Sequence, residues 1–137
     1  MRITALAAAL LLLISVPAGA QEFNSLFAGS DVRRSQLSGG GDIRFDVWKF
    51  TDDGTFTGVF SIEHDSFARS AWVEEGRISG QWRIEGRRLC IDARLQGYAE
   101  QACFTLEQTG RTGSYVEFRG TEEGTDGRWM FHVAPGG

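Results

Sequence analysis

The sequence predicts an all-β domain, an antiparallel meander of about seven or eight strands that forms a small barrel or half-barrel, with a short N-terminal helix. From residue 42 onward, apolar and polar residues alternate in short runs, which is typical of strands with one buried face. Turns that contain glycine separate these runs, and no helical period persists beyond one or two turns. Closing the meander into a barrel removes exposed strand edges, whereas a two-layer sandwich is the alternative.

Residues 1–20 have the features of a secretory signal peptide. Arg2 supplies a positive charge, an apolar run follows from Ala5 to Val16, and small residues precede a cleavage site after Ala20. The apolar run is too short to span a membrane, which needs roughly 20 residues. We therefore expect a single domain over 21–137, periplasmic or secreted, without a membrane anchor.

Composition and charge exclude one class of partner. The chain has 137 residues, 42% of them hydrophobic and 23% charged, which is ordinary for one globular domain. Its formal net charge of −4 argues against nucleic-acid binding, because phosphate contacts need a basic face. We expect a monomer.

The elements are expected in the following order. A short amphipathic helix is predicted over 22–28, where Phe23, Leu26 and Phe27 recur three and four residues apart. Residues 31–38 are ambiguous and would add an eighth strand. Strands are predicted at 42–50, 55–62, 77–84, 87–95, 98–108, 115–119 and 128–133.

Tight turns predict the register of three hairpins. A two-residue loop at Asp53-Gly54 is the strongest short hairpin signal, and Glu85-Gly86 and Gln96-Gly97 are read in the same way. The resulting pairs are Phe45 with Ile62, Val47 with Phe60, Trp82 with Leu89, Gly80 with Ile91, Leu89 with Phe104, and Ile91 with Ala102.

The third hairpin predicts a disulfide. Its register places Cys90 directly opposite Cys103 on the reverse face, at a non-hydrogen-bonded pair, where Cα atoms are about 4.5 Å apart. The chain has two cysteines, and export would put them in an oxidising compartment. We predict a structural bridge between them.

Several motifs carry a resemblance to known proteins. The segments Asp53-Gly54-Thr55 and 80–90, followed by Cys103, match the pattern D-G-T, G-x-W-x-x-x-G-x-x-L-C and a second Cys. This pattern resembles small exported, disulfide-containing β-domain proteins of alphaproteobacteria, a largely uncharacterised group that implies a secreted β-domain and no activity. Gly80-Gln81-Trp82 is also similar to the G-x-W of lipocalin-like barrels and bacterial metalloprotease inhibitors, although that motif opens those barrels and here lies mid-chain.

Binding is the predicted function, with a small apolar or amphipathic ligand in the barrel as the first hypothesis. The inward side chains that would line a cavity are Phe45, Val47, Phe60, Ile62, Trp82 and Phe104. Side chains alone can also fill a barrel of this size. On this register the reverse face presents Trp48 and Phe50, which we expect the N-terminal helix to cover.

A protein-binding or inhibitory module of the cell envelope is the alternative function. The segment 63–76 is longer than the other turns and carries Phe67, Arg69 and Trp72, a composition typical of interface hot spots. The alternative for these residues is a strand extension whose aromatic side chains close the barrel mouth.

Catalysis, metal binding and cofactors are not predicted. The candidates for a Ser/His/Asp site are His64, Asp65 and Ser66 or Ser70. These residues are neighbours in one loop, which need not face one another, and no Gly-x-Ser-x-Gly nucleophile elbow accompanies them. The carboxylate pairs Asp52/Asp53, Glu74/Glu75 and Glu122/Glu123 are expected to be surface groups, and no metal site is predicted. Arg33-Arg34 or Arg87-Arg88 could hold an acidic ligand, but genome composition explains the excess of arginine more simply.

Overall fold

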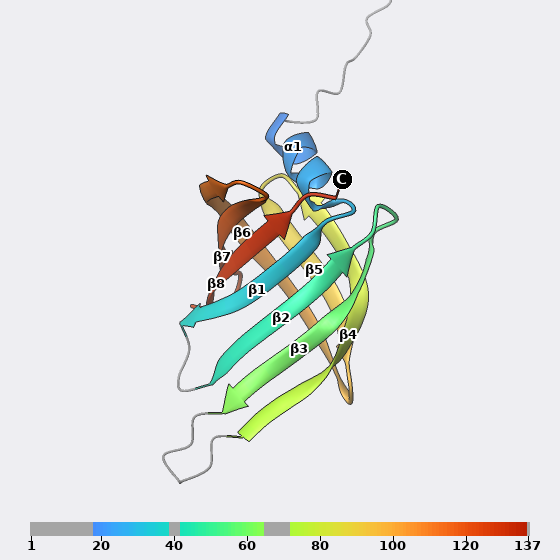
Figure 1. The fold of residues 1–137 in the computed structure, drawn as a ribbon, viewed down its shortest axis with the longest axis vertical. Helices are drawn as coiled ribbons and strands as arrows, with labels where there is room; N and C mark the ends of the chain where they lie inside the picture. Colours follow the sequence, from blue (N-terminus) through green and yellow to red (C-terminus); the bar gives the residue numbers. More distant parts are fainter. Residues whose placement is uncertain (1–17, 39–41, 65–71, 137) are drawn as a thin grey trace, which may run out of the picture.

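The protein is an eight-stranded antiparallel barrel in which every strand pairs with its neighbours along the chain and β8 pairs with β1 (Figure 1). The computed structural model describes residues 18–38, 42–64 and 72–136. Its elements are α1 (Ala18–Phe27), β1 (Asp31–Ser38), β2 (Ile43–Phe50), β3 (Thr55–His64), β4 (Trp72–Glu85), β5 (Arg88–Leu95), β6 (Tyr98–Thr112), β7 (Tyr115–Glu122) and β8 (Arg128–Ala134). The predicted strands and helix are confirmed, and 31–38 is the eighth strand that closes the barrel.

Helix α1 closes one end of the barrel, the upper end in Figure 1. Its Phe27 is fully buried, with ring centroids 5.8 Å from Phe50 and 5.6 Å from Phe118. Gly29 ends the helix with a φ of 71°, a conformation that costs glycine little. The helix therefore contacts Phe50 as predicted, but it does so inside the barrel and not on a reverse face.

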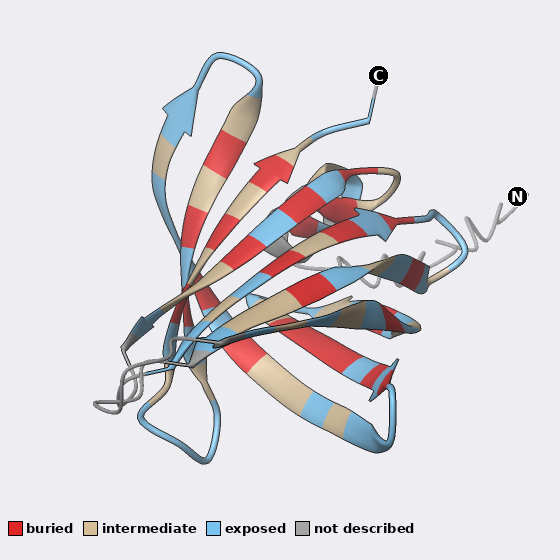
Figure 2. Cartoon of the chain, turned by 60° about the horizontal axis from the view of Figure 1, so that its bottom comes forward, coloured by how far each residue is buried: buried red, intermediate tan, exposed pale blue. Residues whose placement is uncertain are grey.

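The core fills the barrel interior. Side chains alternate between buried and exposed along the strands, as expected when successive residues point to opposite faces (Figure 2). Aromatic rings dominate the inside, where Trp48 stacks on Phe50 at 5.7 Å and Phe104 packs against Phe131 at 5.2 Å. This packing joins α1 and the strands into one hydrophobic core.

The β5–β6 hairpin has the predicted register. Leu89 pairs with Phe104 and Ile91 with Ala102, on either side of the Cys90–Cys103 pair. The two cysteines form a disulfide, and their Cα atoms are 4.0 Å apart. Both the turn at Gln96-Gly97 and the bridge are confirmed.

The predicted β2–β3 register is wrong by one residue. The loop has three residues, 52–54, with Gly54 at a φ of 87°, so Phe45 pairs with Ser61 and Val47 with Val59. A shift of one residue exchanges the two faces of a strand. Phe45 and Val47 consequently point outward, and Trp48 and Phe50, predicted on the reverse face, lie inside.

The predicted β4–β5 register is wrong by two residues. The turn is Gly86-Arg87, which pairs Trp82 with Ile91 and Gly80 with Ala93. Because side chains repeat every two residues along a strand, this shift preserves the faces. Trp82 therefore remains inside the barrel as predicted.

Candidate functional site

The half of the barrel away from α1 holds four charged side chains, Arg34, Arg44, Asp46 and Glu100, which we call the interior cluster. Arg34 Nη2 lies 2.9 Å from Asp46 Oδ2, and its Nη1 lies 2.9 Å from Glu100 Oε1. Arg44 Nε lies 3.0 Å from Asp46 Oδ1, and its Nη2 lies 2.7 Å from Glu100 Oε2. Two cations and two anions therefore form one neutral network.

Aromatic side chains surround Arg34. Its guanidinium carbon lies 4.5 Å from the ring centroid of Trp48 and 4.2 Å from that of Trp129. Trp48 also donates its indole N–H to Asp46 at 3.1 Å. Cation–π contacts and charged hydrogen bonds together hold a charge that would be costly to bury alone.

The electrostatics of the interior cluster favour its ionised state. Burial raises the pKa of Glu100, but Arg34 and Arg44 outweigh that effect, so the pKa lies below its ordinary value. Burial lowers the pKa of Arg44, but the charges and hydrogen bonds of Asp46 and Glu100 raise it by more. The pKa of Arg44 therefore lies above its ordinary value. Both shifts favour the charged forms of Glu100 and Arg44.

The residues predicted to line a ligand cavity are divided between two faces. Phe60, Ile62, Trp82 and Phe104 face the interior, whereas Phe45 and Val47 face outward. Trp82 stacks on Phe50 with centroids 5.1 Å apart and donates its indole N–H to Thr51 O at 3.0 Å, near α1. Phe104 packs between other rings, so these residues contact the core rather than a common cavity.

An apolar surface lies on the outside of β1 to β4, and we call it the outer wall. Its outward hydrophobic side chains are Leu37, Ile43, Phe45, Val47, Val59 and Val73. Val59 is 53% exposed and Phe45 is 39% exposed. Direct pairing of Val47 with Val59 makes this surface continuous across β2 and β3.

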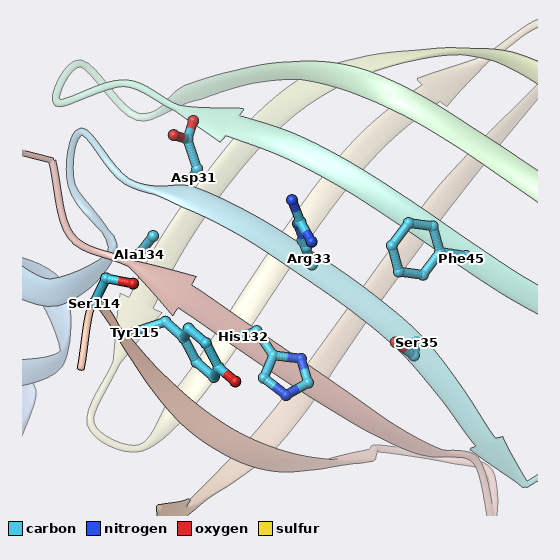
Figure 3. A pocket seen from close by; sticks show the side chains of 8 residues that line it. All are labelled: Asp31, Arg33, Ser35, Phe45, Ser114, Tyr115, His132 and Ala134. Carbon is cyan, nitrogen blue, oxygen red and sulfur yellow. The ribbon is translucent and has the colours of Figure 1, made fainter. Parts of the chain in front are cut away.

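Phe45 separates two hollows on the outer surface. The first, about 570 Å³, is lined by Asp31, Arg33, Ser35, Phe45, Ser114, Tyr115, His132 and Ala134 (Figure 3). The second, about 430 Å³, is lined by Phe45, Val47, Val59, Phe60, Ser61, Glu75, Gly76 and Arg77. One exposed aromatic ring thus borders both hollows.

The first hollow has a charged and aromatic lining. His132 Nε2 lies 3.1 Å from Glu117 Oε2, and the His132 ring meets Tyr115 edge-on at 5.2 Å. Hydrogen bonds from Thr109 and then His132 hold the pKa of Glu117 below its ordinary value. Arg33 is the neighbour of His132 on β1 and forms no ion pair with another residue that the structure describes.

Much of the predicted loop 63–76 is strand. β3 continues to His64 and β4 begins at Trp72, which pairs with His64. Phe67 and Arg69 lie outside the described residues. The same is true of Asp65, Ser66 and Ser70, which the hypothetical Ser/His/Asp site would need beside His64. The described part of the segment instead adds Val73 to the outer wall.

The remaining arginine and carboxylate pairs lie outside the interior cluster. Arg88 bonds Glu85 and Glu123 at the surface, and Asp53 accepts hydrogen bonds within its own turn. No group of three His, Cys, Asp or Glu in 18–38, 42–64 and 72–136 is arranged to hold a metal ion. Within the same ranges, no helix has the length and hydropathy needed to cross a membrane.

Sequence reasoning missed the interior cluster. The sequence indicates Arg34 only as part of the Arg33-Arg34 pair, and the two residues point to opposite faces of β1. Comparison of the chain with protein-family models, with curated proteins and with solved structures finds no match.

Proposed function

We propose that the protein is an exported, non-catalytic binding domain that docks a segment of a partner protein on its outer wall. One observation carries the proposal: the exposed Phe45 ring stands between two hollows on a continuous apolar surface. Contiguous apolar patches are unusual on monomeric proteins and mark interaction sites. An aromatic anchor beside arginine is typical of binding hot spots.

The charges of the two hollows favour a partner segment that combines carboxylates with apolar side chains. Arg33 lines one hollow and Arg77 the other, and neither pairs with an acidic group among the described residues. Asp31, in contrast, is matched by Lys49 at 3.4 Å. Glu75 also lines the second hollow, and its negative charge would repel additional carboxylates of the partner segment.

Export is supported by two features. The first 20 residues read as a signal peptide, and the Cys90–Cys103 disulfide suits an oxidising compartment. The proposed location is therefore the periplasm or the medium.

An apolar ligand inside the barrel is less well supported. Trp82 and Phe104 pack against Phe50 and Phe131, so an apolar guest at their level would have to displace well-packed rings. Binding of a partner segment to the outer wall requires no displacement of core side chains.

Site-specific photocrosslinking in the cell envelope tests the proposal. A photoreactive phenylalanine analogue at position 45 or 59 should crosslink a partner, whereas the same analogue at Arg94, exposed on β5, should not. The crosslinked segment, identified by mass spectrometry, should contain Asp or Glu among apolar residues. Affinity for that purified segment should fall at least about 10-fold in Phe45→Ser or Arg33→Glu, as expected for hot-spot residues.

Two results would contradict the proposal. Absence of crosslinks from both wall positions, in a protein that circular dichroism shows to be folded, removes the outer wall as the docking surface. A crosslink to a second copy of the chain, with a dimer in analytical ultracentrifugation, assigns the wall to self-association instead.

A further inference from the structure

We infer that the half of the barrel away from α1 binds a small neutral molecule through a carbonyl oxygen, which accepts hydrogen bonds from Arg34 Nε and Trp129 Nε1. Both donors are buried, and neither makes a hydrogen bond to a described residue. This site is inside the barrel and is independent of the outer wall.

The hydrogen bonds of the interior cluster define what a ligand must supply. Asp46 accepts hydrogen bonds from Arg34, Arg44 and Trp48. Glu100 forms ion pairs with both arginines, and its Oε2 is matched by the Arg44 charge at 2.7 Å without a hydrogen bond of good geometry. Two N–H donors, Arg34 Nε and Trp129 Nε1, have no hydrogen-bond partner among the described residues. A buried donor without an acceptor costs free energy, which a ligand oxygen in the right place would recover.

The side chains that carry the two donors are in contact. The Arg34 guanidinium carbon lies 4.2 Å from the centroid of the Trp129 ring, so the two groups are in direct contact. The same guanidinium carbon also lies 4.5 Å from the ring centroid of Trp48. Flat aromatic faces next to hydrogen-bond donors suit a planar group such as an amide.

Charge favours a neutral ligand over an anion. The four charges of the interior cluster already balance, so an added carboxylate would bring an uncompensated charge into a buried site. A neutral carbonyl oxygen satisfies the donors without that cost.

Exposure indicates the direction of entry. Arg34 and Asp46 have no exposed side-chain surface, whereas the side chains of Arg44 and Glu100 are 13% and 15% exposed. The Arg44–Glu100 pair is therefore the layer nearest solvent. The opposite end is closed by α1, so the ligand enters past this pair.

Two-dimensional ¹H–¹⁵N NMR tests the inference with N-methylacetamide as the probe and acetate as a charged control of similar size. Addition of N-methylacetamide should shift the Trp129 indole and Arg34 Nε–H signals saturably, while acetate should not. The Trp82 indole signal is the internal control, because that N–H is bonded to Thr51 O near α1. In Trp129→Phe, the affinity for N-methylacetamide obtained from the Arg34 Nε–H shift should fall at least about 10-fold.

The wild-type titration decides the matter even if Trp129→Phe unfolds. The inference is overturned if neither donor signal responds, if both respond without saturation, or if acetate produces the stronger response. It is also overturned if water cross-peaks at both donors persist at the highest amide concentration, since a bound water then satisfies them. Phe45→Ser should leave the titration unchanged, which separates this result from the fate of the outer wall.

Discussion

The guanidinium of Arg34 and the carboxylate of Asp46 meet 2.9 Å apart inside the barrel, and neither side chain is exposed. β1 and β2 supply these groups, and Glu100 of β6 extends the network to Arg34 from across the barrel. Buried charges are tolerated only when each is matched and hydrogen-bonded. Arg34 and Asp46 are direct neighbours on β1 and β2, and Glu100 connects β6 to this pair beside the proposed ligand site.

Removing one member of this pair should strongly destabilise the protein. Asp46→Ala leaves Arg34 with one buried anion fewer and Trp48 without its acceptor, so the free energy of unfolding should fall by about 3 to 5 kcal/mol. Urea unfolding at neutral pH measures the loss. Glu85→Ala breaks solvent-screened surface ion pairs with Arg83 and Arg88 and should lower the free energy of unfolding much less. Equal losses in both variants would contradict the role given to burial.

Acid should weaken the interior cluster through Glu100. Its pKa is lower in the folded protein than its ordinary value of 4.5, so its stabilising contribution is present above 4.5 and disappears as the pH falls through the folded pKa. Glu100→Gln should therefore be less stable than the wild type at pH 7, and the gap should narrow below pH 4.5. Chemical unfolding across this range measures both curves.

A surface carboxylate provides the control for this pH dependence. The hydrogen bond from Arg83, with the charges of Arg83 and Arg88, lowers the pKa of Glu85, but the Glu85 side chain is 47% exposed and solvent screens the pair. Glu85→Gln should therefore produce a smaller gap at pH 7. A Glu100→Gln gap that stays constant from pH 7 to pH 3 would show that ionisation of Glu100 does not stabilise the fold.

The barrel and its disulfide were predictable because local patterns determine them. Alternation identified the strands, and the turn at Gln96-Gly97 fixed the pairing of Cys90 with Cys103. The predicted β2–β3 register was wrong because Asp53-Gly54 is compatible with a two-residue turn and also with the three-residue loop that forms, in which Gly54 has a positive φ. That one-residue difference reversed the assignment of Phe45 and Val47.

The interior cluster was harder to predict because its members come from distant parts of the chain. Arg34 and Glu100 are 66 residues apart, and nothing local signals that they meet. A partial signal existed in β2, where Asp46 shares a face with Trp48 and Phe50. With the correct register, a charge on that apolar face would have required a buried partner.

Loss of the disulfide should destabilise the hairpin without abolishing the fold. Because the bridge joins residues only 13 apart, Cys90→Ala with Cys103→Ala should lower the free energy of unfolding by about 2 to 3 kcal/mol. Urea unfolding of the wild type with a reductant should give a similar loss. The double variant should not respond to the reductant, and a response there would mean that the loss has another cause.

Gly58 should be intolerant of any side chain, because an added Cβ would lie 2.1 Å from Val47 O and 2.9 Å from Trp48 Cα. The obstacle is backbone of the neighbouring strand, which cannot move without breaking the β2–β3 ladder. Gly58→Ala should therefore lower the free energy of unfolding by about 3 kcal/mol or more. Gly110→Ala, where no atom lies within 4 Å of the added Cβ, should change it by no more than about 0.5 kcal/mol. Urea unfolding of both variants measures the difference, and equal stability would mean that β2 and β3 do not approach as closely as described.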